Sequence, residues 1–125
     1  MKPLNKAVLA LVAGLVMQAG GAWAGSCGAS ECWGAVGVGP GGAWGYSHSW
    51  HSEAEAIDAA HEGCEWDCTD MFSFYNGCAA IALTPDQQYY GRGFGWTRSD
   101  AEAEAYAACS AFGTGCAIRV WACSK

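Results

Sequence analysis

Hydrophobic and polar positions along the chain alternate over short segments with the spacing of β-strands. In one kind of segment, small and aliphatic residues run up to a proline turn. In a second kind, large and tiny side chains alternate with a period of two, as in a strand with one bulky and one bare face. A third short strand-like segment follows each of the two stretches that predict helices, at residues 71–75 and 117–122. The expected strands span residues 32–40, 44–50, 71–75, 78–85, 90–96 and 117–122.

Two alanine-rich stretches predict helices, and each begins with a Ser-x-x-Glu capping box at Ser52 or Ser99. The serine accepts a hydrogen bond from the third helical N–H while the glutamate reaches back. We expect the helices to end near Gly63 and Gly113. Their inward side chains are small, which suits helices lying close on sheets whose large side chains fill the gap. These positions are Ala56, Ala60, Cys64, Ala101, Ala105, Ala108 and Cys109.

The chain matches itself when it is shifted by 45–48 residues, which predicts a repeated unit over about residues 32–77 and 78–125. Each unit reads strand, strand, helix, strand. Two such units with pseudo-twofold symmetry, sharing one antiparallel sheet or facing each other, predict an α+β fold. We expect a single domain, because 125 residues are too few for two independent cores.

The N-terminus has the order of a secretory signal peptide over residues 1–24. Two lysines precede an apolar run at residues 7–17, and a small-residue site ends at Ala24, where we expect cleavage. The apolar run is too short to span a membrane. The mature domain would be residues 25–125, either secreted or periplasmic. An alternative makes Cys27 a lipid-anchored N-terminus.

Charge narrows the class of partner. The chain carries a net charge of −6, and removal of Lys2 and Lys6 with the leader leaves 4 − 12 = −8. Nucleic acid and anionic lipid are poor partners for such a protein. The sequence leaves the oligomeric state open.

All eight cysteines lie after the leader, and an even number in a small exported chain predicts disulfides. Alignment of the two units pairs Cys64 with Cys68 and Cys109 with Cys116. The remaining four allow three pairings, of which Cys78 with Cys123 is the weak preference. The four are Cys27, Cys32, Cys78 and Cys123. Zinc is disfavoured because no C-x2-C pair is present, and we expect no metal or other cofactor.

Taken together, these motifs resemble the secreted bacterial domain-of-unknown-function family 4189. The first copy reads W-G-A-V-G-V, then G-x-x-x-G-Y-S and S-E-A-E-A, and the second reads C-A-A-I-A-L, G-x-G-x-x-W, S-D-A-E-A-E-A and C-A-I-R-V-W-A-C. The resemblance covers about residues 32–124. It implies export and the doubled unit, but no reaction and no catalytic residues.

The nearest approach to a catalytic motif is a nucleophile-elbow-like segment at Ser47 and His48. Because neighbouring strand residues point to opposite faces, the two cannot exchange a proton directly. A metal site built from His48, His51 and His61 is also disfavoured, since the second unit lacks the first two. We therefore expect no enzymatic activity and no catalytic residues.

Two aromatic ladders lie on the strands with period-two alternation. We expect most of their side chains in the core, with His48 and Arg92 marking where each ladder reaches water. Exposed ladders of this kind can instead bind sugars or peptides. The ladders are Trp44, Tyr46, His48 and Trp50, and Tyr90, Arg92, Phe94 and Trp96.

The first predicted helix carries a stripe of carboxylates without a basic residue between them. The leading hypothesis is a non-enzymatic protein-binding module, of inhibitor or immunity type, whose stripe docks a basic protein. The alternative is a carbohydrate- or cell-wall-binding protein, or an uncharacterised enzyme, that uses the aromatic strand faces. The candidate binding residues are Glu55, Asp58, Glu62, Glu65, Trp50, Arg92 and Trp96.

Overall fold

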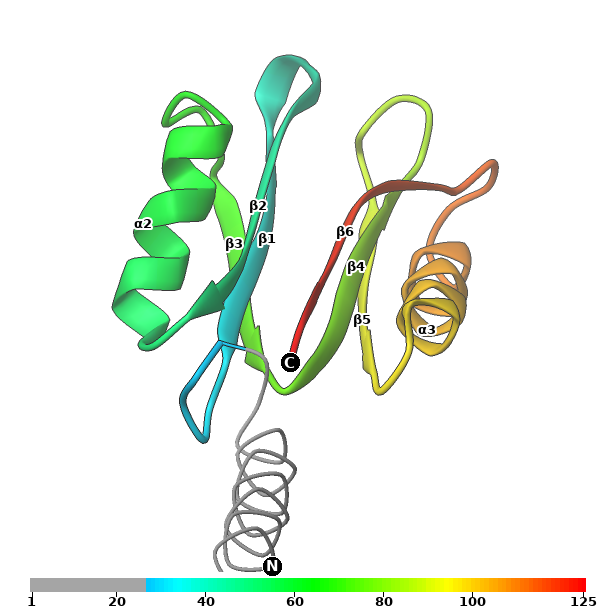
Figure 1. Ribbon diagram of the computed structural model, residues 1–125. Helices are drawn as coiled ribbons and strands as arrows, with labels where there is room; N and C mark the ends of the chain where they lie inside the picture. The colour runs from blue at the N-terminus through cyan, green and yellow to red at the C-terminus, as the bar shows by residue number, and fades with distance from the viewer. Residues whose placement is uncertain (1–26) are drawn as a thin grey trace, which may run out of the picture.

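A computed structural model describes residues 27–125, so the expected leader lies outside the described residues. The described chain forms two three-stranded antiparallel sheets, each covered by one helix on its outer side (Figure 1). The first unit contains β1 (Trp33–Gly39), a 3-10 turn η1 (Pro40–Gly42), β2 (Ala43–Trp50), α2 (Glu53–Gly63) and β3 (Asp70–Tyr75). The second contains β4 (Gly77–Leu83), β5 (Tyr90–Gly95), α3 (Arg98–Ser110) and β6 (Ala117–Ser124).

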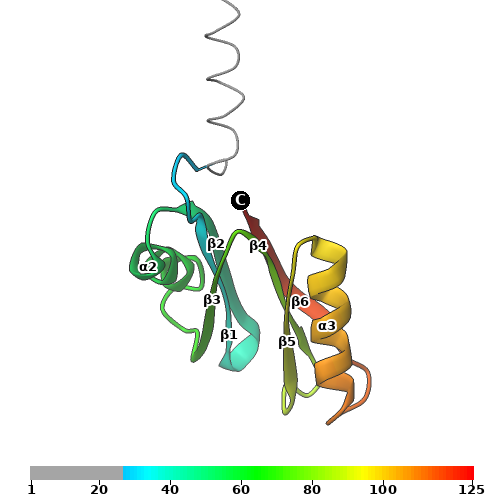
Figure 2. The ribbon, with the colours of Figure 1, turned by 90° about the horizontal axis from the view of Figure 1, so that it is seen from below.

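The two units have the same topology, which confirms the predicted repeat and the α+β fold. The strand orders are β2-β1-β3 and β5-β4-β6, with the first strand of each unit at the centre of its sheet. Of the two arrangements left open by the sequence, the structure shows separate sheets that face each other (Figure 2). Asn76 alone links β3 to β4, in a left-handed conformation with φ of 51°.

The core between the two sheets consists of aliphatic and aromatic side chains from the central strands and from β3 and β6. Val36 and Ile81, which are fully buried, come from the two central strands, and Phe74 and Val120 come from β3 and β6. Burial of these side chains is the main stabilising contribution to the contact between the units. The cluster comprises Val36, Val38, Phe74, Ala79, Ile81, Val120 and Ala122.

Each helix packs on the bare face of its sheet, where the β2 and β5 residues closest to the helix are glycine and serine. A methyl group added at Gly93 would lie 2.1 Å from the carbonyl oxygen of Ala101, and one at Gly45 would lie 2.3 Å from that of Ala60. Such close approach requires small side chains on both elements. The expected small inward positions of the helices are confirmed except Ala108, which is only partly buried. The expectation that large strand side chains fill the gap is wrong.

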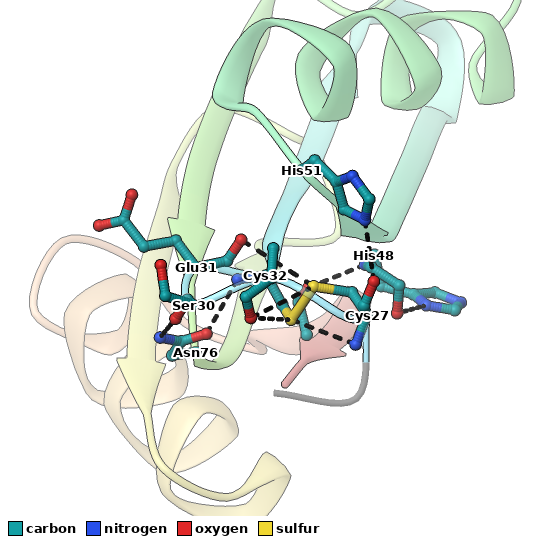
Figure 3. The surroundings of a disulfide bond; sticks show 10 residues. Cys27, Ser30, Glu31, Cys32, His48, His51 and Asn76 are labelled. Carbon is teal, nitrogen blue, oxygen red and sulfur yellow. Dashed lines mark hydrogen bonds between the residues drawn. A yellow bond between two sulfur atoms is a disulfide. The ribbon is translucent and has the colours of Figure 1, made fainter. Parts of the chain in front are cut away.

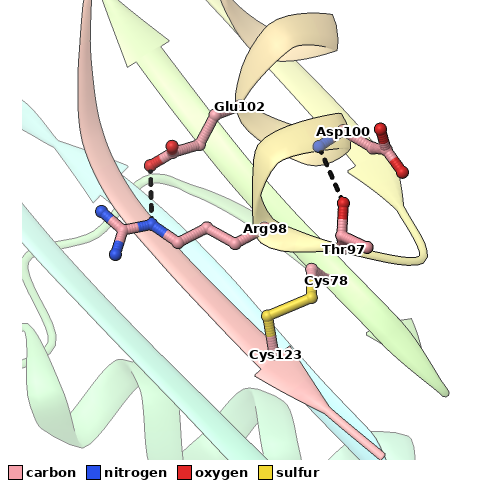
Figure 4. Close-up of polar contacts among 6 residues, drawn as sticks. All are labelled: Cys78, Thr97, Arg98, Asp100, Glu102 and Cys123. Carbon is pink, nitrogen blue, oxygen red and sulfur yellow. Dashed lines mark hydrogen bonds and ion pairs between the residues drawn. A yellow bond between two sulfur atoms is a disulfide. The ribbon is translucent and has the colours of Figure 1, made fainter.

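The first capping box is confirmed and the second is displaced. Ser52 caps α2, and its hydroxyl accepts from the N–H of Glu55. α3 is capped by Thr97 rather than Ser99, because Thr97 has the extended backbone that a cap needs and its hydroxyl accepts from the Asp100 N–H at 3.1 Å (Figure 4). Ser99 lies inside the helix. α2 ends at Gly63 as expected, whereas α3 ends at Ser110, before Gly113.

All eight cysteines form disulfides, and each bond closes within one unit. The three expected pairs are confirmed, and the fourth joins Cys27 to Cys32 ahead of β1 (Figure 3). That bond occupies the Cys27 sulfur, so no free thiol remains there for a lipid anchor. Four disulfides indicate an oxidising compartment. The pairs are Cys27–Cys32, Cys64–Cys68, Cys78–Cys123 and Cys109–Cys116.

Candidate functional site

Most side chains of both aromatic ladders are exposed, so the expectation that they form core is wrong. Trp96 is 70% exposed, and Trp44, Tyr46, Tyr90 and Phe94 are between 40% and 48% exposed. The physical reason is the packing of the helices. Because α2 and α3 take the glycine faces, the bulky faces of β2 and β5 turn toward the other sheet, where the buried core takes its side chains from β1, β3, β4 and β6.

The β2 ladder forms a row of nearly parallel rings. The ring of Tyr46 lies 6.2 Å from that of Trp44 and 6.4 Å from that of His48, with interplanar angles of 6° and 11°. These rings line a groove of about 450 Å³ opposite β6, which contributes Arg119. The Arg119 guanidinium donates to the carbonyl oxygen of Gly42 at 2.6 Å, so part of its donor capacity is already used.

Trp50 does not belong to the β2 ladder. The register slips between Trp33 and Ala35, and Ser49 is left-handed with φ of 65°, which together mark an extra residue in β2. A bulge of this kind reverses the alternation of faces. Trp50 therefore shares a face with its partner Trp33 and not with Trp44, contrary to the sequence expectation.

Three members of the β5 ladder, Arg92, Phe94 and Trp96, line a hollow of about 620 Å³ along the edges of β3 and β5. The guanidinium of Arg92 lies 4.3 Å from the centre of the Phe72 ring, and the Tyr90 ring lies 5.8 Å from the same ring. Phe94 and Trp96 line the hollow further along, with ring centres 6.4 Å apart. Of the candidate binding residues, only Arg92 and Trp96 meet at this hollow.

The carboxylate stripe lies on the outer face of α2. Glu55, Asp58 and Glu62 are exposed there, opposite the buried Ala56 and Ala60. Glu65 is exposed as well but follows the end of the helix, so the stripe is three helical residues and one loop residue. Within residues 27–125 the only ion pair joins Arg98 and Glu102 (Figure 4), and no basic side chain neutralises the stripe.

Trp66 stands beside the end of this stripe and was not singled out from the sequence. It is 63% exposed, and its ring stacks on His61 at 5.4 Å with an interplanar angle of 4°. Glu65 and Trp66 both adopt left-handed backbone conformations inside the loop closed by Cys64–Cys68. The predicted Cys64–Cys68 pairing could have indicated this exposure, because an aromatic residue inside so short a disulfide loop has little room to reach the core.

Ser47 and His48 lie on opposite faces of β2, as predicted. The Ser47 hydroxyl is buried and donates to the Ala56 carbonyl oxygen at 2.6 Å, which ties β2 to α2. The exposed His48 ring contacts the Ser49 hydroxyl at 3.0 Å, and the His51 Nε2 lies 2.8 Å from the Cys27 carbonyl oxygen (Figure 3). Across residues 27–125, no three His, Cys, Asp or Glu side chains gather as metal ligands would.

Comparison with protein families matches residues 33–123 to the family described as "Domain of unknown function (DUF4189)". The chain belongs to the DUF4189 family. Its match covers every strand and both helices of the two units. The solved structures include a similar chain, the NMR structure of Rv1813c from Mycobacterium tuberculosis, which is 31% identical with a TM-score of 0.58 over 74% of each chain. No curated protein matches the chain.

The family is described only as a domain of unknown function, so the match brings no activity or partner to this chain. In the described part of the chain, neither helix is long and apolar enough to cross a membrane.

Proposed function

We propose that this DUF4189 domain is a non-enzymatic protein-binding module, of inhibitor or immunity type, that docks a basic protein on the outer face of α2. One observation carries the proposal. The exposed carboxylates of Glu55, Asp58 and Glu62 continue into Glu65 and end beside the exposed ring of Trp66.

The charge of this face would steer a basic partner toward it. Oppositely charged surfaces accelerate encounter, and the acceleration weakens with salt because ions screen exposed charges over about 8–10 Å. No lysine or arginine lies on α2, and the only non-acidic polar side chain between the members of the stripe is His61. The net charge, −6 for the whole chain and −8 after the expected removal of the leader, acts in the same direction.

Trp66 would supply the contact that holds the partner after encounter. Tryptophan is among the residues most often found at the centre of protein interfaces, because its large surface is removed from water on binding. The Cys64–Cys68 loop and the stacked His61 ring already hold Trp66 in place. A side chain that is ordered before binding loses less entropy when the complex forms.

The test uses a panel of basic secreted cell-wall hydrolases of the lysozyme type, immobilised one at a time. Two variants carry the same change in net charge: Asp58→Lys with Glu62→Lys on α2, and Glu31→Lys with Asp100→Lys elsewhere. We expect one panel member to bind the wild-type protein, and binding to weaken as salt is raised. The α2 variant should bind at least about tenfold more weakly, a loss of about 1.4 kcal/mol, and the control less than about threefold more weakly.

Trp66→Ala tests the anchor separately and should also weaken binding by about tenfold, without changing the salt dependence. Equal losses in the two charge variants would show that overall charge, not the α2 face, drives binding. If no panel member binds even at low salt, the proposal that the module targets this class of basic protein fails.

A further inference from the structure

The hollow between the β3 and β5 edges lies in both units and away from the outer face of α2. Its volume, about 620 Å³, falls in the range of small-molecule binding sites. We propose that this hollow binds a neutral oligosaccharide. The proposal is independent of docking at α2, and it gives the carbohydrate hypothesis a site.

Exposed aromatic rings line the hollow from both units, one from β3 and two from β5 and the residue that follows it. Trp96 is 70% exposed, Tyr75 45% and Phe94 44%, although each ring could be covered by a ligand in the hollow. Large aromatic side chains left bare at a concave surface mark binding sites, because covering them removes apolar area from water. A pyranose ring offers a flat C–H face to such a ring while its hydroxyls point to the rim. Tyr75 and Trp96 suit such a ligand, because each has an apolar ring face and one polar group that can hydrogen-bond at the rim.

Arg92 supplies fixed hydrogen-bond donors to the hollow. Its guanidinium rests on the Phe72 ring at 4.3 Å and makes no ion pair with any residue from 27 to 125. Stacking leaves the donors at the edge of the planar guanidinium free, and it orders the side chain before a ligand arrives. Hydroxyl oxygens of a sugar would accept from these donors.

Carboxylates from both helices complete the rim. Glu53 of α2 accepts from the Ser73 hydroxyl through Oε2 at 2.6 Å, which fixes the carboxylate and leaves its second oxygen available. Glu104 of α3 lines the same hollow. Hydroxyl groups both donate and accept, so a sugar can use the carboxylates and Arg92 together. The two carboxylates and the net charge of −8 disfavour an anionic ligand, and Arg92 at the centre disfavours a cationic one.

The groove between β2 and β6 provides an internal comparison. It is the counterpart of the hollow under the pseudo-twofold relation and carries the ladder Trp44, Tyr46 and His48, but no carboxylate lines it. Its arginine, Arg119, already donates to the Gly42 carbonyl oxygen. Of these two grooves, only the hollow combines an arginine that donates to no carbonyl oxygen of residues 27–125 with carboxylates at its rim.

Isothermal titration of the oxidised, exported protein with hexasaccharides tests the proposal. The probes are cellohexaose and chitohexaose, which are neutral, a hexagalacturonide, which is anionic, and a fully deacetylated chitohexaose, which is cationic. We expect a neutral hexamer to bind best. Trp96→Ala should weaken that binding by about tenfold and Trp96→Phe by less than about threefold, because phenylalanine keeps an aromatic face. Arg92→Gln should weaken it by a similar factor, since hydrogen bonds to the guanidinium are lost.

Trp44→Ala is the matched control, because it removes an exposed ladder tryptophan from the other groove. Its binding should stay within about twofold of wild type. Circular dichroism and an intact mass with eight oxidised cysteines check that each variant is folded. The proposal is overturned if no neutral hexamer binds at millimolar concentration, if a charged hexamer binds more tightly, or if Trp44→Ala loses as much affinity as Trp96→Ala. The Asp58→Lys, Glu62→Lys variant should retain sugar binding, so the two proposals fail separately.

Discussion

Gly93 lies where β5 passes closest to α3, and replacing it with alanine tests how the helices sit on the sheets. The added methyl carbon would lie 2.1 Å from the Ala101 carbonyl oxygen and 2.4 Å from the Ala105 nitrogen. Ordinary contact begins at 3.4 Å, so the helix backbone would have to retreat by 3.4 − 2.1 = 1.3 Å. Overfilling a packed region costs about 1–3 kcal/mol, and obstruction by backbone on two sides places Gly93→Ala at the upper end.

We therefore expect Gly93→Ala to lower the free energy of unfolding by about 3 kcal/mol. For a domain of this size that corresponds to a fall in Tm of about 12–24 °C. The assay is guanidinium unfolding with the disulfides intact, followed by tryptophan fluorescence. Both midpoint and slope should be fitted, since an unchanged slope shows that the change lies in stability.

Gly63→Ala is the matched control. Gly63 is the last residue of α2, and a methyl group there would meet its nearest neighbours at 3.7 Å, an ordinary contact. This substitution should leave stability unchanged or raise it by up to about 1 kcal/mol, because alanine favours the helix. If Gly93→Ala unfolds within about 0.5 kcal/mol of wild type, α3 does not rest on the glycine face and the packing described above is wrong.

Two further predictions concern a cap and a titrating side chain. Thr97→Ala should cost about 1 kcal/mol in the same unfolding assay and Ser99→Ala less than about 0.5 kcal/mol; the reverse order would place the cap of α3 at Ser99. The Thr84 hydroxyl, which donates to Asp86 at 2.7 Å, and then the Gln88 N–H hold the pKa of Asp86 below its ordinary value. Thr84→Val should raise that pKa in an NMR titration, and an unchanged pKa would contradict this account. Because the folded pKa is depressed, the stabilising effect is present above the ordinary pKa of aspartate and is lost as pH falls through the folded value.

The repeat explains why much of the fold was predictable. Because the chain presents each pattern twice, the order of elements along each unit and two equivalent disulfides, Cys64–Cys68 and Cys109–Cys116, followed from alignment of one unit with the other. The N-cap of the first helix was predictable because Ser52 is the clear candidate there. At the second helix, Thr97 and Ser99 both precede the helical pattern, and only the backbone conformation distinguishes them.

The positions of the aromatic side chains could not be read from alternation alone. A period of two shows that a strand has a bulky and a bare face, but not which face meets the helix. Gly91 and Gly93 indicate which face meets the helix, since a glycine in a strand often marks the close approach of another backbone. Two small surfaces pack together, helix alanines on strand glycines, and this leaves the large rings for the grooves where a ligand can reach them.

Since every disulfide closes within one unit and Asn76 is the single link between β3 and β4, the two halves are covalently independent except at that residue. Their mutual affinity rests on the core between the sheets and on bonds such as that from the Ser49 N–H to the Ser124 hydroxyl. The architecture is thus that of a heterodimer fused end to end. Under the pseudo-twofold relation, the contact between the halves has the form of an isologous dimer interface, in which the same face of each half meets the other.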